Sequence, residues 1–297
     1  MSTSGSGIRI AHRTVYVNGE FVRAEDAKVS VFDRGFVFGD GVYEVIPVIR
    51  QRLMDRKHAL ERLDHSLSST GIGWPCSREA LIAVLEELLM RDDLQEGYVY
   101  LQITRGVAER DFALPVGAQQ GLVAWGVPRS IIDHPLAING VAVASVPDLR
   151  WKRRDIKSVN LLAQCLSKQM AVEQGGYEGW MIDEGVVTEG VTSSAFIVRA
   201  NTLITRASNG SILPGIRRKV ILRVARENDI GLQEREFTLE EACIADEAFM
   251  SSATTLVLPV VNIDGRTIGN GRPGPVTQKL RALYVQTLLE EAGVVAD

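Results

Sequence analysis

Two kinds of hydrophobic spacing run through the chain. Apolar and polar residues alternate on both sides of Asn18-Gly19, which predicts a β-hairpin over 14–22. Similar β-type runs predict strands at 97–106, 122–127, 141–146, 177–182 and 186–190. Apolar residues at helical spacing predict helices that begin near Lys57, Ser77, Ser158, Ile216 and Val276. The last three of these helices are expected to end before Gly175, near Glu227 and near Glu291.

One stretch interrupts this succession of elements. Residues 128–139 contain Pro135 and few periodic apolar positions, which is typical of a linker. At 297 residues the chain suits one large or two moderate domains. We therefore expect a small N-terminal domain over 1–127, a linker over 128–139, and a larger C-terminal domain over 140–297.

Composition narrows the class of protein. The chain is 45% hydrophobic and 24% charged with a net charge of −4, so it lacks the basic footprint of a nucleic-acid-binding protein. No apolar run is long enough to cross a bilayer, and residues 1–7 form a short Ser/Gly tail rather than a signal peptide. The three cysteines have apolar neighbours and indicate reduced core residues of a cytoplasmic protein, and the histidines show no metal-ligand spacing.

Lys157 is the first candidate for chemistry. It lies between Ile156 and Val159, ahead of apolar residues at helical spacing, and Ser158 is expected to cap that helix. A lysine in an apolar site loses part of its charge stabilisation, so its amine becomes a usable nucleophile toward carbonyl compounds. Taken alone, an ordinary cation at the start of a helix is the commoner explanation.

Two further segments carry suggestive residues. Three glycines punctuate 33–46, which by itself fits a glycine-punctuated pair of strands. In Thr188-Glu189-Gly190 a glutamate interrupts an apolar strand, and a buried carboxylate needs a charged partner. An exposed glutamate on an edge strand would be the usual explanation for this second segment.

These segments become specific in combination. Arg150-Trp151 followed by Asp155-Ile156-Lys157-Ser158, the Asp33-Arg34-Gly35 and Gly39-to-Glu44 signature, and Thr188-Glu189-Gly190 closely resemble the fold-type IV pyridoxal-phosphate enzymes. Within that family the match is closest to the D-amino-acid transaminases, and it runs from about Val15 to Tyr284. The resemblance implies a two-domain α/β fold, a homodimer and pyridoxal 5'-phosphate as cofactor.

The resemblance also implies residue roles on the cofactor side. Lys157 would hold the cofactor as a Schiff base and move a proton, while Glu189 would face the pyridine nitrogen. Arg62 would hold the phosphate, because a planar guanidinium suits bidentate binding. The remaining cofactor contacts would come from Leu213 against the ring, from the helix start at Gly215, Ile216 and Arg217, and from the turn of Ser252, Ala253 and Thr254.

On the substrate side the chain departs from the family pattern. The resemblance implies that Tyr43 and Val45 line the pocket. D-amino-acid transaminases carry an Arg-x-His pair that reaches across the dimer interface to hold the substrate carboxylate. Arg110 matches the arginine, but Phe112 occupies the histidine position, so half of this carboxylate site is missing.

The resulting hypothesis is a transaminase that exchanges amino groups between D-amino acids, of the D-alanine and D-glutamate type, and 2-oxo acids by a ping-pong mechanism. Phe112 also permits an R-selective amine:pyruvate transaminase. A branched-chain-type L-amino-acid transaminase, an aminodeoxychorismate-type lyase and a catalytically silent binding protein are further alternatives.

Overall fold

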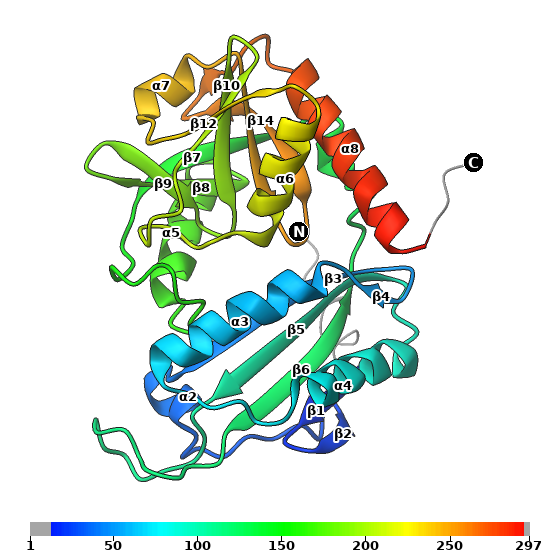
Figure 1. Cartoon of the computed structure of the whole chain (residues 1–297). Helices are drawn as coiled ribbons and strands as arrows, with labels where there is room; N and C mark the ends of the chain where they lie inside the picture. The colour runs from blue at the N-terminus through cyan, green and yellow to red at the C-terminus, as the bar shows by residue number, and fades with distance from the viewer. Residues whose placement is uncertain (1–12, 294–297) are drawn as a thin grey trace. The chain divides into compact units, whose positions relative to one another are not determined.

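The computed structural model describes residues 13–293 and is shown in Figure 1. The chain divides into two compact units. The first unit contains the described residues up to Arg129 together with Ile156–Asn160, and the second contains Ser130–Asp155 and Leu161 onward. By its contacts, the segment that carries Lys157 therefore groups with the first unit, whereas the sequence analysis placed it in the C-terminal domain.

The first unit is built on an antiparallel six-stranded sheet with the order β2-β1-β6-β5-β3-β4. The strands are β1 (Thr14–Val17), β2 (Glu20–Arg23), β3 (Gly41–Ile49), β4 (Arg52–Leu53), β5 (Glu96–Thr104) and β6 (Gly121–Pro128). The helices are α2 (Arg34–Phe38), α3 (Arg56–Thr70) and α4 (Arg78–Arg91). Helix α3 packs on β3 and α4 packs on β1 and β6 (Figure 1).

The two faces of this sheet differ. Glu44, Leu101 and Ala124 are partners across β3, β5 and β6, and all three are fully buried. Their sequence neighbours Tyr43 and Trp125 point to the opposite face and are only half-buried. One face is therefore closed by helices, and the other presents aromatic side chains.

The second unit contains a nine-stranded mixed sheet with the order β12-β11-β10-β13-β14-β7-β8-β9, with β15 paired to β14. Its strands are β7 (Val141–Pro147), β8 (Glu178–Asp183), β9 (Val186–Gly190), β10 (Ser194–Arg199), β11 (Thr202–Thr205), β12 (Gly231–Glu234), β13 (Glu247–Ser252), β14 (Leu256–Ile263) and β15 (Arg266–Thr267). Its helices are η1 (Pro135–Ala137), α5 (Leu162–Glu173), α6 (Ile216–Glu227), α7 (Leu239–Cys243) and α8 (Pro275–Glu291).

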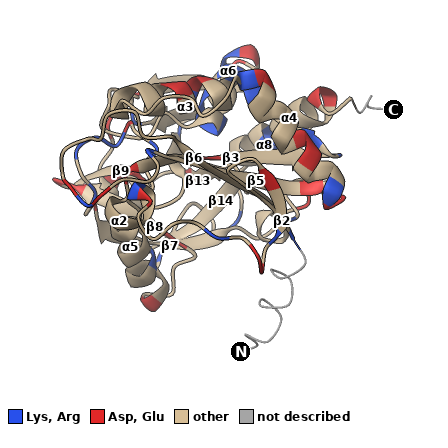
Figure 2. Cartoon of the chain, turned by 90° about the horizontal axis from the view of Figure 1, so that it is seen from below, with Lys and Arg blue, Asp and Glu red and all other residues tan. Residues whose placement is uncertain are grey.

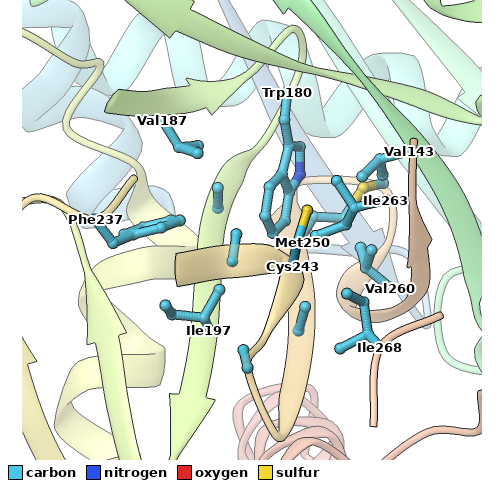
Figure 3. Packing of buried hydrophobic residues seen from close by; sticks show 14 of the residues in the cluster. Val143, Trp180, Val187, Ile197, Phe237, Cys243, Met250, Val260, Ile263 and Ile268 are labelled. Carbon is cyan, nitrogen blue, oxygen red and sulfur yellow. The ribbon is translucent and has the colours of Figure 1, made fainter. Parts of the chain in front are cut away.

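Apolar side chains bury the second sheet on both faces. Trp180 and Phe237 meet edge to face, with ring centroids 6.2 Å apart, in the cluster that Figure 3 shows. Met181, the next residue of β8, belongs to a separate cluster with Ala171 of α5. Helices α4 and α6 carry several charged residues, and the central strands are largely uncharged (Figure 2). Among the described residues, no helix combines the length and apolar character that a membrane crossing requires.

Most predicted elements are confirmed, including the Asn18-Gly19 hairpin and the helices near Lys57, Ser77, Ile216 and Val276. The predicted strand pair over 33–46 is wrong in its first half, because the Asp33 side chain accepts from the Gly35 N–H and caps helix α2. Ser158 does not cap α5, which begins four residues later; it forms an isolated β-bridge with Val42 instead.

The prediction that all three cysteines lie in the core is also wrong. Cys165 is exposed on α5, while Cys243 is buried and Cys76 is partly buried. Glu247 follows the acidic residue Asp246 in the sequence, but it does not lie on a solvated face. It is buried and accepts from the N–H groups of Val276 and Thr277, so it caps the closing helix.

Candidate active site

In the first unit, backbone hydrogen bonds fix Lys157 beside the start of β3. The Tyr43 N–H donates to the Lys157 carbonyl (3.0 Å), and the Val159 N–H donates to the Gly41 carbonyl (3.0 Å). The Lys157 N–H donates to Ser66 Oγ of α3 at 3.1 Å. Lys157 Nζ lies 4.2 Å from the centroid of the Tyr43 ring. The amine is therefore held at the aromatic face of the first sheet.

This aromatic face contains residues that the sequence analysis did not single out. Tyr43 stacks on Tyr100 with centroids 5.5 Å apart, and Tyr100 contacts Trp125 with centroids 4.4 Å apart. The Tyr100 hydroxyl donates to Gln102 Oε1 (2.8 Å), and burial raises the pKa of Tyr100. Val45 is paired with Tyr100 in the register of β3 and β5. The period-two alternation of β5 placed Tyr98, Tyr100 and Gln102 on one face and could have identified this surface.

Arg62 is held on the other face of β3. Its guanidinium makes a bidentate pair with Glu44, with Nε to Oε1 at 2.8 Å and Nη2 to Oε2 at 2.7 Å. The side chains of Arg62 and Glu44 are 9% and 1% exposed. Ser66, one helical turn along α3 from Arg62, is the residue that contacts the Lys157 backbone. Arg62 was expected from the sequence, but its partner Glu44 was not.

Arg110 and Phe112 lie on the loop that follows β5, and both are exposed. Arg34 of α2 reaches the loop between them, with Nη1 donating to the Asp111 carbonyl at 2.6 Å. The Arg34 Nε also donates to Asp40 Oδ2 at 2.7 Å. A buried arginine therefore connects the glycine-rich signature to the loop.

In the second unit, Glu189 lies on β9 and is buried. Its Oε1 accepts from Arg150 Nη1 at 2.5 Å and from the Leu213 N–H at 3.0 Å. Burial raises the pKa of the Glu189 carboxyl, and the Arg150 charge opposes that rise. The buried carboxylate thus has the charged partner that its position requires.

Asp148 extends this network and was missed by the sequence analysis. It accepts from Arg150 Nε and Nη2 at 2.9 and 2.7 Å and from the Thr188 hydroxyl at 2.8 Å. Arg154 Nε lies 3.4 Å from Asp148 Oδ2. Burial raises the pKa of the Asp148 carboxyl, but the hydrogen bonds and charges of the arginines outweigh it, so the pKa falls below its usual range.

The start of α6 has the features of an anion-binding site. Gly215 is the N-cap residue, no side chain caps the helix, and no acidic residue lies in its first turn. A Cβ at Gly215 would lie 2.7 Å from Ser194 Oγ, so a side chain at this position would crowd the helix entry. The buried Arg217 guanidinium lies 6.0 Å from the Tyr284 ring centroid, and Ile216 is also buried. The backbone of this helix start is the part that suits a phosphate.

A cluster of hydroxyls lies next to this helix start. Ser194 on β10, which Gly215 approaches, pairs with Ser251 on β13. In the turn that follows, Ser252 Oγ lies 2.9 Å from Thr255 Oγ1 and 3.4 Å from Thr254 Oγ1. Ala253 lies within the same turn and is partly buried. The Leu213 N–H, two residues before Gly215, donates to Glu189. Glu189, the start of α6 and the hydroxyl turn therefore lie close together in the second unit.

The chain is similar to known aminotransferases. The family model for amino-transferase class IV matches residues 41–263. A D-alanine aminotransferase from Staphylococcus haemolyticus is 39% identical over 267 residues, which cover 90% of this chain and 95% of that protein.

Two solved structures share the fold. The branched-chain amino acid aminotransferase of Escherichia coli is 26% identical with a TM-score of 0.86, and the match covers 96% of this chain and 97% of that chain. A second branched-chain amino acid aminotransferase (T.th.), complexed with N-(5'-phosphopyridoxyl)-L-glutamate, is 24% identical with a TM-score of 0.87, and the match covers 96% of each chain. The protein belongs to the class IV aminotransferase family.

Proposed function

We propose that this protein is a pyridoxal-phosphate-dependent transaminase that exchanges amino groups between D-amino acids and 2-oxo acids. The observation that carries the proposal is the position of Lys157, whose amine is held over the Tyr43 ring at the aromatic face of the first sheet. The identity to D-alanine aminotransferases, which extends over nine-tenths of the chain, supports this choice of substrate.

The residues present fit pyridoxal phosphate. Lys157 Nζ is the group that would attach the cofactor and then move a proton at the substrate carbon. The uncapped start of α6 and the Ser252–Thr254 hydroxyls would hold the phosphate, together with Arg62. When bound, the cofactor supplies an electron sink for the negative charge that remains when the substrate carbon loses its proton.

Glu189 is the residue we assign to the pyridine nitrogen. Its two hydrogen bonds, from Arg150 and from the Leu213 N–H, both use Oε1. Oε2, which neither of these bonds uses, is the oxygen we assign to the ring. Arg150, which Asp148 holds in turn, keeps the Glu189 carboxylate in one orientation, and Leu213 would pack against the ring from the adjacent segment.

Arg110 favours a donor that carries a carboxylate. A single guanidinium can bind a carboxylate bidentately, and Arg110 supplies one on this loop. This favours D-amino acids over the R-selective amine:pyruvate alternative that Phe112 permits. The branched-chain L-specific alternative is supported by a shared fold at lower sequence identity than that to the D-alanine enzymes.

A panel of amino donors tests the function. The purified protein with pyridoxal phosphate is mixed with D-alanine, D-glutamate, L-leucine, L-glutamate or R-1-phenylethylamine, with 2-oxoglutarate or pyruvate as acceptor. We expect transfer from D-alanine and D-glutamate at rates well above those of the other donors. Faster transfer from L-leucine or from the amine would overturn the D-specific proposal, pyruvate release without an acceptor would indicate a lyase, and no transfer would indicate a binding protein.

We further propose a homodimer in which the 107–115 loop of one subunit serves the site of its partner. In the first unit, several apolar residues on or near this loop are exposed. Their exposed fractions are 65% for Val31, 53% for Phe32, 71% for Phe36 and 80% for Phe112. Clustered exposed apolar side chains are typical of a protein interface. A second copy of the chain is the partner we propose for this surface.

We also propose a cytoplasmic location. Cys76, Cys165 and Cys243 are free thiols, and one of them is exposed. Free thiols persist in a reducing compartment, where disulfides are rare.

A further inference from the structure

We propose that Phe112 and Phe38 form an aromatic clamp that orients Arg110 toward the carboxylate of the amino donor. The clamp would replace the hydrogen-bonding histidine that the sequence pattern of D-amino-acid transaminases leads one to expect. This inference rests on the proposed function and concerns how the same site recognises its substrate.

The clamp is visible in three contacts. The Arg110 guanidinium carbon lies 5.5 Å from the Phe38 ring centroid and 5.6 Å from the Phe112 centroid. The two phenyl rings lie 5.6 Å apart, tilted by 49°. Both rings thus contact one guanidinium at distances at which a cation is attracted to an aromatic face.

Arg34 contacts both the Phe38 ring and the loop backbone and so stabilises the clamp. Its guanidinium carbon lies 4.6 Å from the Phe38 ring centroid, and Nη1 donates to the carbonyl of Asp111, the residue between Arg110 and Phe112. The Arg34 side chain is 4% exposed and is fixed by Asp40. The loop backbone and the Phe38 ring are therefore both held by one buried side chain.

The chemistry of the clamp leaves the donor groups of Arg110 usable. A cation–π contact uses the face of the guanidinium plane, while the N–H groups point outward along its edges. A carboxylate binds at such an edge through two parallel hydrogen bonds. A phenyl ring cannot donate to the carboxylate, so Phe112 contributes by reducing the orientations of Arg110 rather than by a second polar contact.

The test compares rings with aliphatic side chains of similar size. Phe112→Leu keeps the apolar bulk and removes the aromatic face, while Phe112→Tyr keeps the face. The control is Val172→Ala, an exposed apolar position on α5 that is remote in sequence from this loop. Each holoenzyme is assayed for kcat and KM with D-alanine, for the dissociation constant of propionate from the change in cofactor absorbance, and for oligomeric state.

We expect Phe112→Leu to raise the KM of D-alanine and the dissociation constant of propionate by about two- to fivefold, with kcat changed by less than twofold. Phe112→Tyr and Val172→Ala should stay within twofold of the wild type in the KM of D-alanine and in the dissociation constant of propionate. Phe38→Leu should reproduce the effect of Phe112→Leu.

Three results would overturn the inference. Equal effects of Phe112→Leu and Phe112→Tyr on the two constants would indicate packing alone. Unchanged propionate binding in Phe112→Leu, or a raised KM that is explained by loss of the oligomer, would also contradict it. These outcomes differ from failure of the proposed function, in which the wild-type protein itself would transfer no amino group from D-alanine.

Discussion

At the residue scale, Arg62 illustrates how a buried charge is held. Arg62 and Glu44 form a bidentate pair that is almost fully removed from solvent. Removing one member leaves the other charge buried without compensation, which costs about 3–5 kcal/mol. Replacing both members can leave the free energy of unfolding nearly unchanged, because no buried charge remains without a partner.

We therefore expect Arg62→Gln to lower the free energy of unfolding of the cofactor-free protein by about 3 kcal/mol or more. The double variant Arg62→Gln/Glu44→Gln should recover most of that loss. Neither variant should bind pyridoxal phosphate well, because the loss of charge-assisted hydrogen bonds should raise the dissociation constant roughly ten- to a hundredfold.

Urea denaturation and absorbance titration measure the two quantities separately. Recovery of cofactor affinity in the double variant would show that Arg62 acts only through Glu44. A stability loss that persists in the double variant would contradict the proposed coupling of the two charges.

Residue roles were predicted from the family resemblance, but the partners of these residues were not. Lys157, Glu189 and Arg62 stand in recognisable local patterns. Arg150 is 39 residues from Glu189 in the sequence, and their contact exists only once β9 is placed beside the 148–154 segment. Glu44 could have been suspected, because it interrupts an apolar strand on the same face as Val42 and Ile46.

At the element scale, the short helix α2 and the strand β3 are connected through Asp40. Its carboxylate accepts from Arg34 Nε at 2.7 Å and from Arg105 Nε and Nη2 at 2.7 and 3.0 Å. Burial raises the pKa of the Asp40 carboxyl, but the two arginines outweigh it and hold the pKa below its usual range. A lowered native pKa means that the folded state is stabilised by the ionised form.

We expect Asp40→Asn to lower the free energy of unfolding by about 3 kcal/mol at neutral pH, since it leaves two buried guanidiniums without their carboxylate. The stabilisation by Asp40 is fully present above its unfolded pKa of about 4 and is lost as the pH falls through its native pKa. The difference in the free energy of unfolding between the wild type and Asp40→Asn should therefore be constant from pH 5 to 7 and should shrink below pH 4.

Urea denaturation at pH 7, 5 and 3.5 measures this difference. Glu184→Gln, at an exposed turn position in the second unit, is the matched control and should leave stability nearly unchanged at each pH. A difference between Asp40→Asn and wild type that does not depend on pH would contradict the assignment.

Long elements were predictable and short ones were not. The hairpin at Asn18-Gly19 and the long helices follow from turn chemistry and periodicity over many residues. Helix α2 has five residues, three of them β-branched or aromatic, and it exists because Asp33 caps its start and Gly39 ends it in the left-handed conformation, with φ of 67°. Ser158 is a residue type that commonly caps helices. In the structure it instead forms a β-bridge with Val42, and the helix begins later, at Leu162.

At the scale of the whole molecule, the exposed apolar surface of the first unit is the feature that a single chain does not explain. Phe36 is 71% exposed, and Phe32 and Val31 close by are more than half exposed. The sequence predicted a dimer only through its family resemblance. Periodicity alone did not reveal this surface, because the segment carries no regular alternation.

We expect the protein to sediment as a dimer and Phe36→Asp to shift it to a monomer with strongly reduced activity, because a charge would be buried without a partner at the interface. Met90→Asp is the matched control, since Met90 on α4 is 60% exposed and is remote in sequence from this surface. Analytical ultracentrifugation at several concentrations makes the measurement. A monomeric wild type, or a Phe36→Asp variant as dimeric as the control, would contradict the proposed interface.

The most direct measurement is the identification of the lysine that binds the cofactor. The chain has seven lysines, and the protein with pyridoxal phosphate is reduced with sodium borohydride, digested and examined by mass spectrometry. We predict that the pyridoxyl group is found on Lys157 and that the Lys157→Ala protein neither gains the group nor transfers an amino group. A pyridoxyl group on another lysine, or undiminished transfer by Lys157→Ala, would contradict the account.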